Sequence, residues 1–277
     1  MGKFRNAKFI IGAFCLSVVI VLALFGNFIT PHSPQEQDLL ASLQPPSFDD
    51  TRYYLGTDHL GRDILARMVS GARVSLLIAT SIVIISGVFG VLFGALSGYW
   101  GGIRDIVLQK IVETFWAFPP ILLALAILAF FGQSLTNIIL ALSIQRWIPY
   151  SRIARAQALV LRNREFVAAS QVMGGGTSWI ISRHILPNLL AAAIVIATFS
   201  MATAILAEAS LSFLGLGVPP EIPTWGGMLA EGRSYVVGAW WIAVFPGLGI
   251  FVTVLGLNLL GDWLRDLLDP KGALNLR

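Results

Sequence analysis

Charged side chains are scarce in this sequence of 277 residues. They make up 12% of the chain, while 56% of its residues are hydrophobic, whereas an average soluble domain has roughly 25% charged residues. A chain with so few charges cannot cover its surface with hydrated side chains, so a water-soluble enzyme, a disordered chain and a collagen are excluded. The composition indicates an all-α integral membrane protein, and its 27 glycines suit closely packed membrane helices.

Cysteine and histidine, which carry much of the chemistry of metal sites, are almost absent. Cys15 is the single cysteine, and His32, His59 and His184 are scattered without the spacing of metal ligands. The sequence also lacks the phosphate-binding G-x-x-x-x-G-K-[ST], the zinc-binding H-E-x-x-H and the nucleophile motif G-x-S-x-G. We therefore predict no catalytic residues, no metal site and no cofactor in this chain.

Six apolar segments are long enough to cross a bilayer, which requires about 20 helical residues. The first, 9–29, follows three basic residues and has no cleavage site after it, so we interpret it as a retained signal anchor. A long charge-free stretch, 114–145, should break at the polar residues 132–137 into a helical hairpin. The remaining predicted spans are 74–99, 136–157, 188–214 and 236–260.

The basic residues divide unequally between the two sides that these spans define. Five lie in predicted outer segments and thirteen in predicted inner segments, which places both termini in the cytoplasm by the positive-inside rule. The net charge of +4 is therefore a feature of topology and gives no reason to expect nucleic acid. The predicted organisation is an inner N-terminus 1–8, an anchor 9–29, a periplasmic segment 30–73, a core 74–261 with an inner loop 160–187, and a cytoplasmic tail 262–277.

The periplasmic segment should contain one amphipathic helix. Thr57 and Asp58 are suited to cap a helix that runs through Arg73, with Asp63 and Arg67 on its polar face. Two interpretations stay open: the helix is a solvated cap over the bundle, or it binds a soluble partner.

Two prolines, Pro119 and Pro120, interrupt the approach to the third span. Proline is tolerated in the first turn of a helix but kinks its interior. We therefore expect residues 105–118 to form a separate helix at the cytoplasmic surface, joined to the span by an elbow.

The inner loop between the fourth and fifth spans is longer than a simple connection needs. Residues 165–173 predict a short helix, which Gly174 should end in the left-handed conformation, and Thr177 or Ser178 should cap the next helix. Small residues occupy the middle of one face, whose members are Phe166, Ala169, Ser170 and Met173. This face either docks a partner or lies on the chain's own bundle.

The same loop resembles the EAA loop of binding-protein-dependent ABC importers. The resemblance rests on Ala168-Ala169-Ser170, followed after three residues by Gly174 and after nine more by HILP at 184–187. Ala168 replaces the glutamate that gives the loop its name, and His184 replaces the usual isoleucine. Further motifs resemble the second permease subunit of dipeptide, oligopeptide and nickel importers: LGTDHLGRD at 55–63, GARVSL at 71–76, RHILPN at 183–188, LSFLGLG at 211–217 and NLLGDWLRD at 258–266.

This resemblance implies a type I ABC importer permease fold in the bacterial inner membrane. It implies a heterodimer with a homologous permease, two ATPase subunits that hold ATP and magnesium, and a substrate-binding protein outside. The EAA-type loop would contact an ATPase through Phe166, Ala168, Ala169, Ser170, Met173 and Gly174. Short peptides are the favoured substrate on family breadth, with chelated nickel or another small solute as the alternative.

A secondary transporter or channel is the rival from another class, and it would need an ion or proton relay. Arg146 and Glu208 are the ionisable residues deep within predicted spans, which is too few for a relay. A charge at such depth is costly unless it is paired, so Arg146 either forms an ion pair or lines the pathway. We favour the pathway, with Asn137, Gln145, Arg146 and Glu208 as its polar residues.

Overall fold

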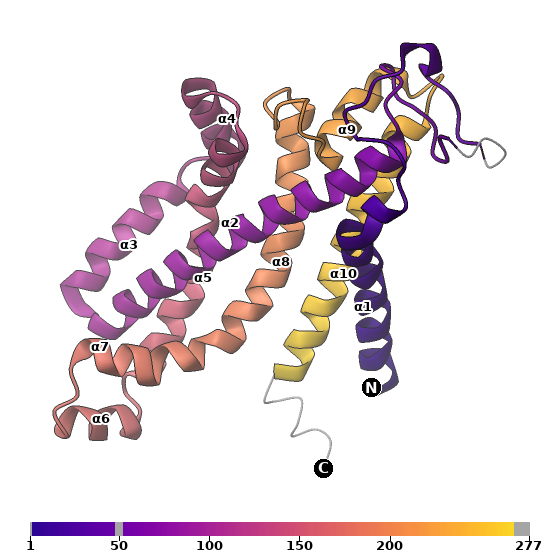
Figure 1. Ribbon diagram of the computed structural model, residues 1–277. Helices are drawn as coiled ribbons and strands as arrows, with labels where there is room; N and C mark the ends of the chain where they lie inside the picture. Colours follow the sequence, from indigo (N-terminus) through magenta and orange to yellow (C-terminus); the bar gives the residue numbers. More distant parts are fainter. Residues whose placement is uncertain (1, 48–51, 269–277) are drawn as a thin grey trace.

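The computed structural model describes residues 2–47 and 52–268, and this part of the chain is predominantly helical (Figure 1). Within it, extended pairing is limited to one isolated bridge between Thr57 and Asp63. The predicted all-α class is confirmed. The helices are α1 (Gly2–Phe25), α2 (Ile64–Trp100), α3 (Gly102–Trp116), α4 (Pro120–Phe131), α5 (Leu135–Leu161), α6 (Glu165–Val172), α7 (Thr177–Ile180), α8 (Leu186–Phe213), α9 (Trp225–Gly232) and α10 (Trp241–Leu268).

Four helical segments in the described residues are long and apolar enough to cross a membrane. They are residues 6–25 of α1, all of α2, the stretch Thr177–Phe213 and α10. A fifth results if α3 and α4, bent by 78° at their junction, count as one broken span. The 27-residue α5 carries three arginines and is not among them. The chain is therefore an all-α membrane protein with four to five candidate spans.

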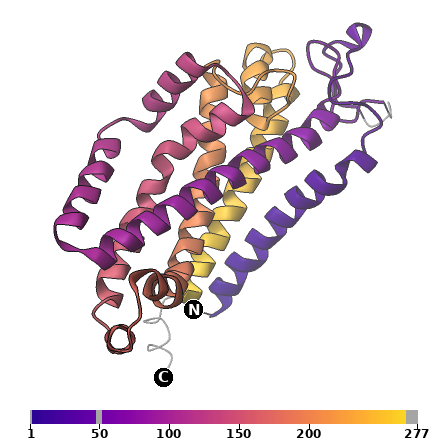
Figure 2. The same ribbon diagram turned by 60° about the vertical axis from the view of Figure 1, so that its left-hand side comes forward.

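The predicted separate helix in the outer segment is wrong. Residues 64–73 are instead the first turns of the 37-residue helix α2, which continues without a break to Trp100. The cap of α2 is Asp63, whose side chain accepts a hydrogen bond from the Leu65 amide. Residues 64–100 contain no proline that would end it. At ~1.5 Å per residue α2 is about 55 Å long, and it crosses the other helices diagonally (Figure 2).

The break at the prolines and the hairpin are confirmed, but the helix before the break is not separate from the span. Helix α4 has 12 residues, too few to cross a bilayer alone, and α3 and α4 are long and apolar enough only together. Helix α3 ends at Trp116 and α4 begins at Pro120, with proline in its first turn as expected. Gly132 then ends α4 with a positive φ of 83°, and Ser134 caps α5 by accepting from the Asn137 amide.

The fifth predicted span, 188–214, agrees with α8 to within two residues, whereas the sixth, 236–260, is shifted towards the C-terminus. The fifth continues back from α8 through a π-helical segment, Ile181–Ile185, to α7, because Pro187 has no amide to extend a regular helix. The sixth, α10, runs from Trp241 to Leu268, so residues 262–268 of the predicted tail are helical, while 269–277 lie outside the described residues. The short helix α9 before it has no counterpart in the sequence prediction.

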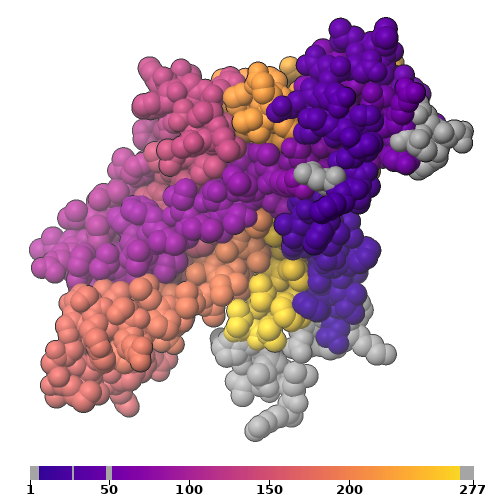
Figure 3. All heavy atoms as spheres, in the orientation of Figure 1, coloured from indigo at the N-terminus to yellow at the C-terminus, as the bar shows by residue number. Residues whose placement is uncertain are grey.

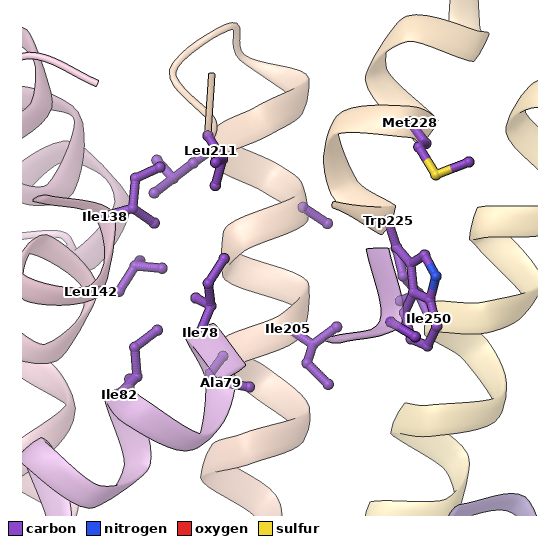
Figure 4. Close-up of a cluster of buried hydrophobic side chains, with 14 of the residues drawn as sticks. Ile78, Ala79, Ile82, Ile138, Leu142, Ile205, Leu211, Trp225, Met228 and Ile250 are labelled. Carbon is purple, nitrogen blue, oxygen red and sulfur yellow. The ribbon is translucent and has the colours of Figure 1, made fainter. Parts of the chain in front are cut away.

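The core joins α2, α5, α8, α9 and α10 through buried aliphatic side chains and two tryptophans, Trp225 and Trp241; Figure 4 shows part of this cluster, with Trp225. Trp225, which is 1% exposed, donates its indole N–H to the Met68 carbonyl over 3.0 Å and so fixes α9 to α2. At the other end of α2, Gly90, Gly94 and Gly98 face α5 so closely that a β-carbon on any of them would overlap a backbone oxygen. This four-residue glycine spacing is the small-xxx-small pattern of tightly packed membrane helices.

Candidate functional site

Helix α6 lies at the same end of the molecule as the start of α1 and the end of α10 (Figure 1). The loop between α1 and α2 and helix α9 lie at the opposite end. In the space-filling view, the segment that carries α6 and α7 projects as a lobe at the lower left (Figure 3). The predicted short helix is therefore present, begins at Glu165 as expected, and is presented at one pole of the bundle.

Of the residues predicted for the docking face of α6, one is buried. Phe166, Ala168, Ala169 and Met173 are exposed, and Met173 is 81% exposed. Ser170 is 3% exposed and points inward, so its assignment to the docking face is wrong. The error arises because the inner side of a helix this short is defined by its contacts, which the sequence does not give.

Gly174 ends α6 as predicted, with a φ of 86°. The Gly174 amide donates to the Gln171 carbonyl over 3.0 Å, and the Gly175 amide donates to the Ser170 carbonyl over 2.9 Å. This pair of bonds is a Schellman motif, which satisfies the last carbonyls of the helix. The predicted caps Thr177 and Ser178 are wrong, since α7 starts after Gly176 with no side-chain cap.

The inward face of α6 is packed against the ends of the long helices. Val167 is fully buried in a cluster that contains Ala95 of α2, Ala158 of α5 and Ile185 before α8. Gln171 adds a hydrogen bond from its amide to the Tyr99 hydroxyl over 3.3 Å. Helix α6 therefore shares one buried cluster with residues of α2, α5 and the start of α8.

An ion pair joins α5 to α3 near this cluster. The Arg155 guanidinium binds both carboxylate oxygens of Asp105, over 2.7 and 2.6 Å, and the Ser97 hydroxyl donates to the same carboxylate. Bidentate arginine–carboxylate pairs fix orientation as well as charge. The elbow helix α3 is thus held to α2 and α5.

Two of the predicted pathway residues cap helix ends. The Asn137 amide donates to the carbonyls of Phe131 and Gly132 at the end of α4, over 2.9 and 3.0 Å. The Gln145 amide donates to the carbonyls of Phe115 and Phe118 at the elbow, over 2.7 and 2.9 Å. Its Oε1 is buried without a hydrogen-bond partner.

Arg146 does not pair with Glu208. Its guanidinium donates to the Thr203 hydroxyl over 2.7 Å and to the Thr203 carbonyl over 2.9 Å, which bridges α5 to α8. No carboxylate of the described chain forms an ion pair with it, and it lies about 16 Å from the start of α5. Tyr150, one turn further along α5, has a buried hydroxyl. Arg146 thus keeps an uncompensated charge among hydrogen-bonding groups.

Glu208 is enclosed at the end of α8 that lies near α9. It is 2% exposed and accepts hydrogen bonds from the hydroxyls of Ser212 and Thr224, each over 2.9 Å. Thr224 also caps α9. These contacts make Glu208 a connection between α8 and α9, distinct from the surroundings of Arg146.

An ion network at the opposite pole was missed by the sequence analysis. Arg67 is 1% exposed and donates to Asp58 over 2.5 Å and to both carboxylate oxygens of Glu231 over 2.8 and 3.1 Å. Arg62 donates to the same two carboxylates, to Asp58 over 2.6 Å and to Glu231 over 3.0 Å. Burial raises the pKa of Asp58. The charges of Arg67 and Arg62 and the hydrogen bonds from the amides of Arg62 and Leu60 lower this pKa by more, so the net shift is downward. The motif at 55–63 was the available signal.

This network also bears on metal binding. Asp58, His59 and Glu231 bring potential ligand atoms within 4.8 Å of one another. Both carboxylates are already paired with Arg62 and Arg67, whose charges would repel a cation. The donor set therefore does not suit a metal ion.

Comparison with known families agrees with this architecture. Residues 90–272 match the family described as "Binding-protein-dependent transport system inner membrane component". The chain belongs to this family. Residues 4–46 also match the "N-terminal TM domain of oligopeptide transport permease C". The chain is a permease of the OppC/DppC type, the inner membrane subunit of an ABC transporter complex and not its ATPase.

Individual relatives cover almost the whole permease. It is 43% identical to the di/tripeptide transport system permease protein DppC of Pseudomonas aeruginosa, over 97% of this chain and 90% of that protein. It is 38% identical to the oligopeptide transport system permease protein OppC of Bacillus subtilis, over 98% and 88%. A chain from inward-facing structures of the MetNI methionine ABC transporter is similar in fold, with a TM-score of 0.59 and 18% identity, over 73% of this chain and 97% of that one.

Proposed function

We propose that this permease carries short peptides, di- or oligopeptides, from a periplasmic binding protein into the cytoplasm. The observation that carries the proposal is similarity along nearly the full chain, at 38 to 43% identity, to permeases named for dipeptides, di/tripeptides and oligopeptides. The partners are a homologous permease, two ATPase subunits with ATP and magnesium, and the binding protein.

The proposed topology has six spans in a type I arrangement, with both termini and α6 in the cytoplasm. The 13-to-5 division of basic residues supports it, as does the position of α6 at the pole where α1 begins and α10 ends (Figure 1). Helix α5 then crosses the membrane despite its arginines, because Arg146 is bonded to α8 and the other two lie nearer its inner end.

This topology can be tested by labelling in intact membranes. Single cysteines replace Leu40, which is 98% exposed in the outer loop, and Ser178, which is exposed beside α6, in a Cys15→Ser background. They should react with an impermeant reagent from opposite sides. Reaction from the same side would contradict the topology and the coupling role of α6.

We infer that α6 contacts an ATPase subunit through Phe166, Ala168, Ala169 and Met173, with Gly174 fixing the end of the helix. Closure of the ATPases on ATP would move α6 as a rigid body, and its packing on α2, α5 and the start of α8 would transmit the movement to the spans. The pathway would then open alternately to each side of the membrane.

We infer that Arg146 receives the carboxylate of the peptide. A guanidinium in a spanning helix requires a group that compensates its charge. In a peptide importer, the carboxylate of the transported peptide can be that group. The anchoring of Arg146 on Thr203 holds the fork in place, and Tyr150 provides a further donor nearby. Asn137, Gln145 and Glu208 would contribute to the same pathway by holding the helix ends around it.

Uptake by proteoliposomes tests the proposed function. The complete complex, with ATP inside and binding protein outside, should accumulate a labelled dipeptide, and omission of this chain should abolish accumulation. Uptake of nickel chelate or another solute without uptake of any di- or oligopeptide would contradict the assigned substrate. Uptake that an ion gradient drives in the absence of ATPase subunits would contradict the assigned class.

A further inference from the structure

A groove runs between α1 and α2 near the pole that carries α9. Its volume is about 480 Å³, and it is lined by four apolar side chains and one arginine: Ile20, Ala23, Leu24, Leu76 and Arg73. Arg73 belongs to the motif at 71–76, to which the transport mechanism assigns no part.

Arg73 caps the end of α1. Its Nε donates to the Ala23 carbonyl and its Nη2 to the Leu24 carbonyl, the latter over 3.3 Å. Its Nη1 has no hydrogen-bond partner among the described residues, and no carboxylate there forms an ion pair with it. Helix-end carbonyls carry only about half a negative charge, so a net positive charge remains beside the groove.

The surroundings of the groove are apolar and exposed. Ile20 and Leu24 on its wall, and Phe25 and Phe28 beyond the end of α1, are all exposed. Side chains of this kind on a spanning helix face lipid. An occupant must therefore be apolar along the groove and carry negative charge at the level of Arg73.

We propose that this groove binds an anionic phospholipid from the leaflet on the α9 side. One acyl chain lies between α1 and α2, and the phosphate accepts hydrogen bonds from Arg73. A guanidinium offers a planar fork that matches a phosphate. The bound lipid would hold the end of α1, the anchor helix, against α2. This proposal concerns the lipid and does not depend on which solute the permease carries.

Native mass spectrometry of the complete complex tests the site. The complex is released from nanodiscs of equal phosphatidylglycerol and phosphatidylcholine, and the retained lipids are counted. The wild-type complex should prefer phosphatidylglycerol about fivefold at one site, as one arginine near the surface contributes ~1 kcal/mol. Arg73→Gln should abolish the preference.

Two further variants separate binding from folding. Ile20→Trp fills the groove at an exposed position and leaves the cap of α1 intact, so it should remove the bound lipid without lowering the yield of the complex. Arg233→Gln is the control, because Arg233 also caps a helix end, donating to the Phe213 carbonyl over 2.9 Å, and does not line the groove. It should keep the preference.

Two outcomes would overturn the proposal. One is unchanged retention of phosphatidylglycerol in both Arg73→Gln and Ile20→Trp. The other is a photo-crosslink from a probe at Ile20 to the second permease subunit and not to lipid, because that subunit would then cover the groove.

Discussion

Gly94 of α2 lies directly against the backbone carbonyl of Ser151 on α5. Gly90 and Gly98, one turn away on either side, face the carbonyls of Trp147 and Arg155 in the same way. Two helices in such close contact cannot slide past one another without separating. Because Val167 of α6 packs beside this contact, we expect α2 and α5 to move together when α6 moves.

Substitution of Gly94 tests this contact. Gly94→Ala should destabilise the permease by roughly 1–3 kcal/mol, because the new methyl group overlaps a backbone oxygen that cannot rotate away. The melting temperature of the purified complex measures the effect. Gly87→Ala is the control, since the same change on the same helix meets only the Tyr150 ring at 3.4 Å and should cost little. Equal melting temperatures for the two variants would contradict the close packing.

The ion network of Asp58, Arg62, Arg67 and Glu231 should contribute strongly to stability. Asp58→Asn leaves the buried Arg67 with a single carboxylate partner, and removal of one partner from a buried pair costs roughly 3–5 kcal/mol. Asp266→Asn in the exposed pair with Lys8 should cost less than about 1 kcal/mol. Thermal unfolding of both variants makes the comparison, and a similar small loss in each would contradict the assigned role.

The pH dependence of the same network follows from the lowered pKa of Asp58. The folded protein binds this proton less readily than the unfolded chain does. The stabilisation from Asp58 is therefore complete above its ordinary pKa of 3.8 and is lost as the pH falls through the lower folded value. Wild-type and Asp58→Asn proteins should differ in stability by a constant amount between pH 5 and 8, and the difference should shrink only in stronger acid.

Gly174 should be essential for coupling and dispensable for insertion. Gly174→Val places a β-branched residue at a φ of 86°, which strains the end of α6 although the space around it is open. Transport should fall at least several-fold while the yield of the complex stays near normal. Gly174→Asn should retain most activity, because asparagine tolerates the left-handed region. Equal transport by both variants would contradict a conformational role for Gly174.

Arg146→Gln should weaken the selection of substrates that carry a carboxylate. The loss of a charge-assisted contact of 1.5–3 kcal/mol corresponds to a roughly 10- to 100-fold lower uptake of a free dipeptide. A dipeptide amide should be affected much less. Arg152→Gln, on the exposed inner part of α5, should leave the ratio of the two unchanged. A lower yield of assembled complex, with an unchanged ratio in the complex that does assemble, would assign Arg146 to structure alone.

Helix ends and bends that one proline or glycine determines could be predicted from the sequence. Pro119 and Pro120 gave the elbow, and Gly174 gave the end of α6, because each restricts or frees the backbone at its own position. The family was also evident from the sequence, since its motifs are contiguous.

Features that depend on three-dimensional contacts were not predicted. Asp63 and Arg67 have the spacing of an exposed helical pair, but the structure buries Arg67 with Glu231, which is 164 residues away along the chain. Asn137 and Gln145 were assigned to the pathway for the polarity that they add near Arg146, and the sequence did not show that their amides bind carbonyls at the ends of α4 and α3. Sequence spacing gives the face of a helix and not its partner.

Crosslinking from α6 tests the central claim, that this helix is the contact with the ATPase. A photoreactive group is attached to a single cysteine at Met173 or at Ile103 of α3, which are 81% and 80% exposed, in a Cys15→Ser background. In the assembled complex, Met173→Cys should crosslink to an ATPase subunit and Ile103→Cys should not. Crosslinks of equal yield from both positions, or none from Met173→Cys in a complex that hydrolyses ATP in response to loaded binding protein, would contradict the account.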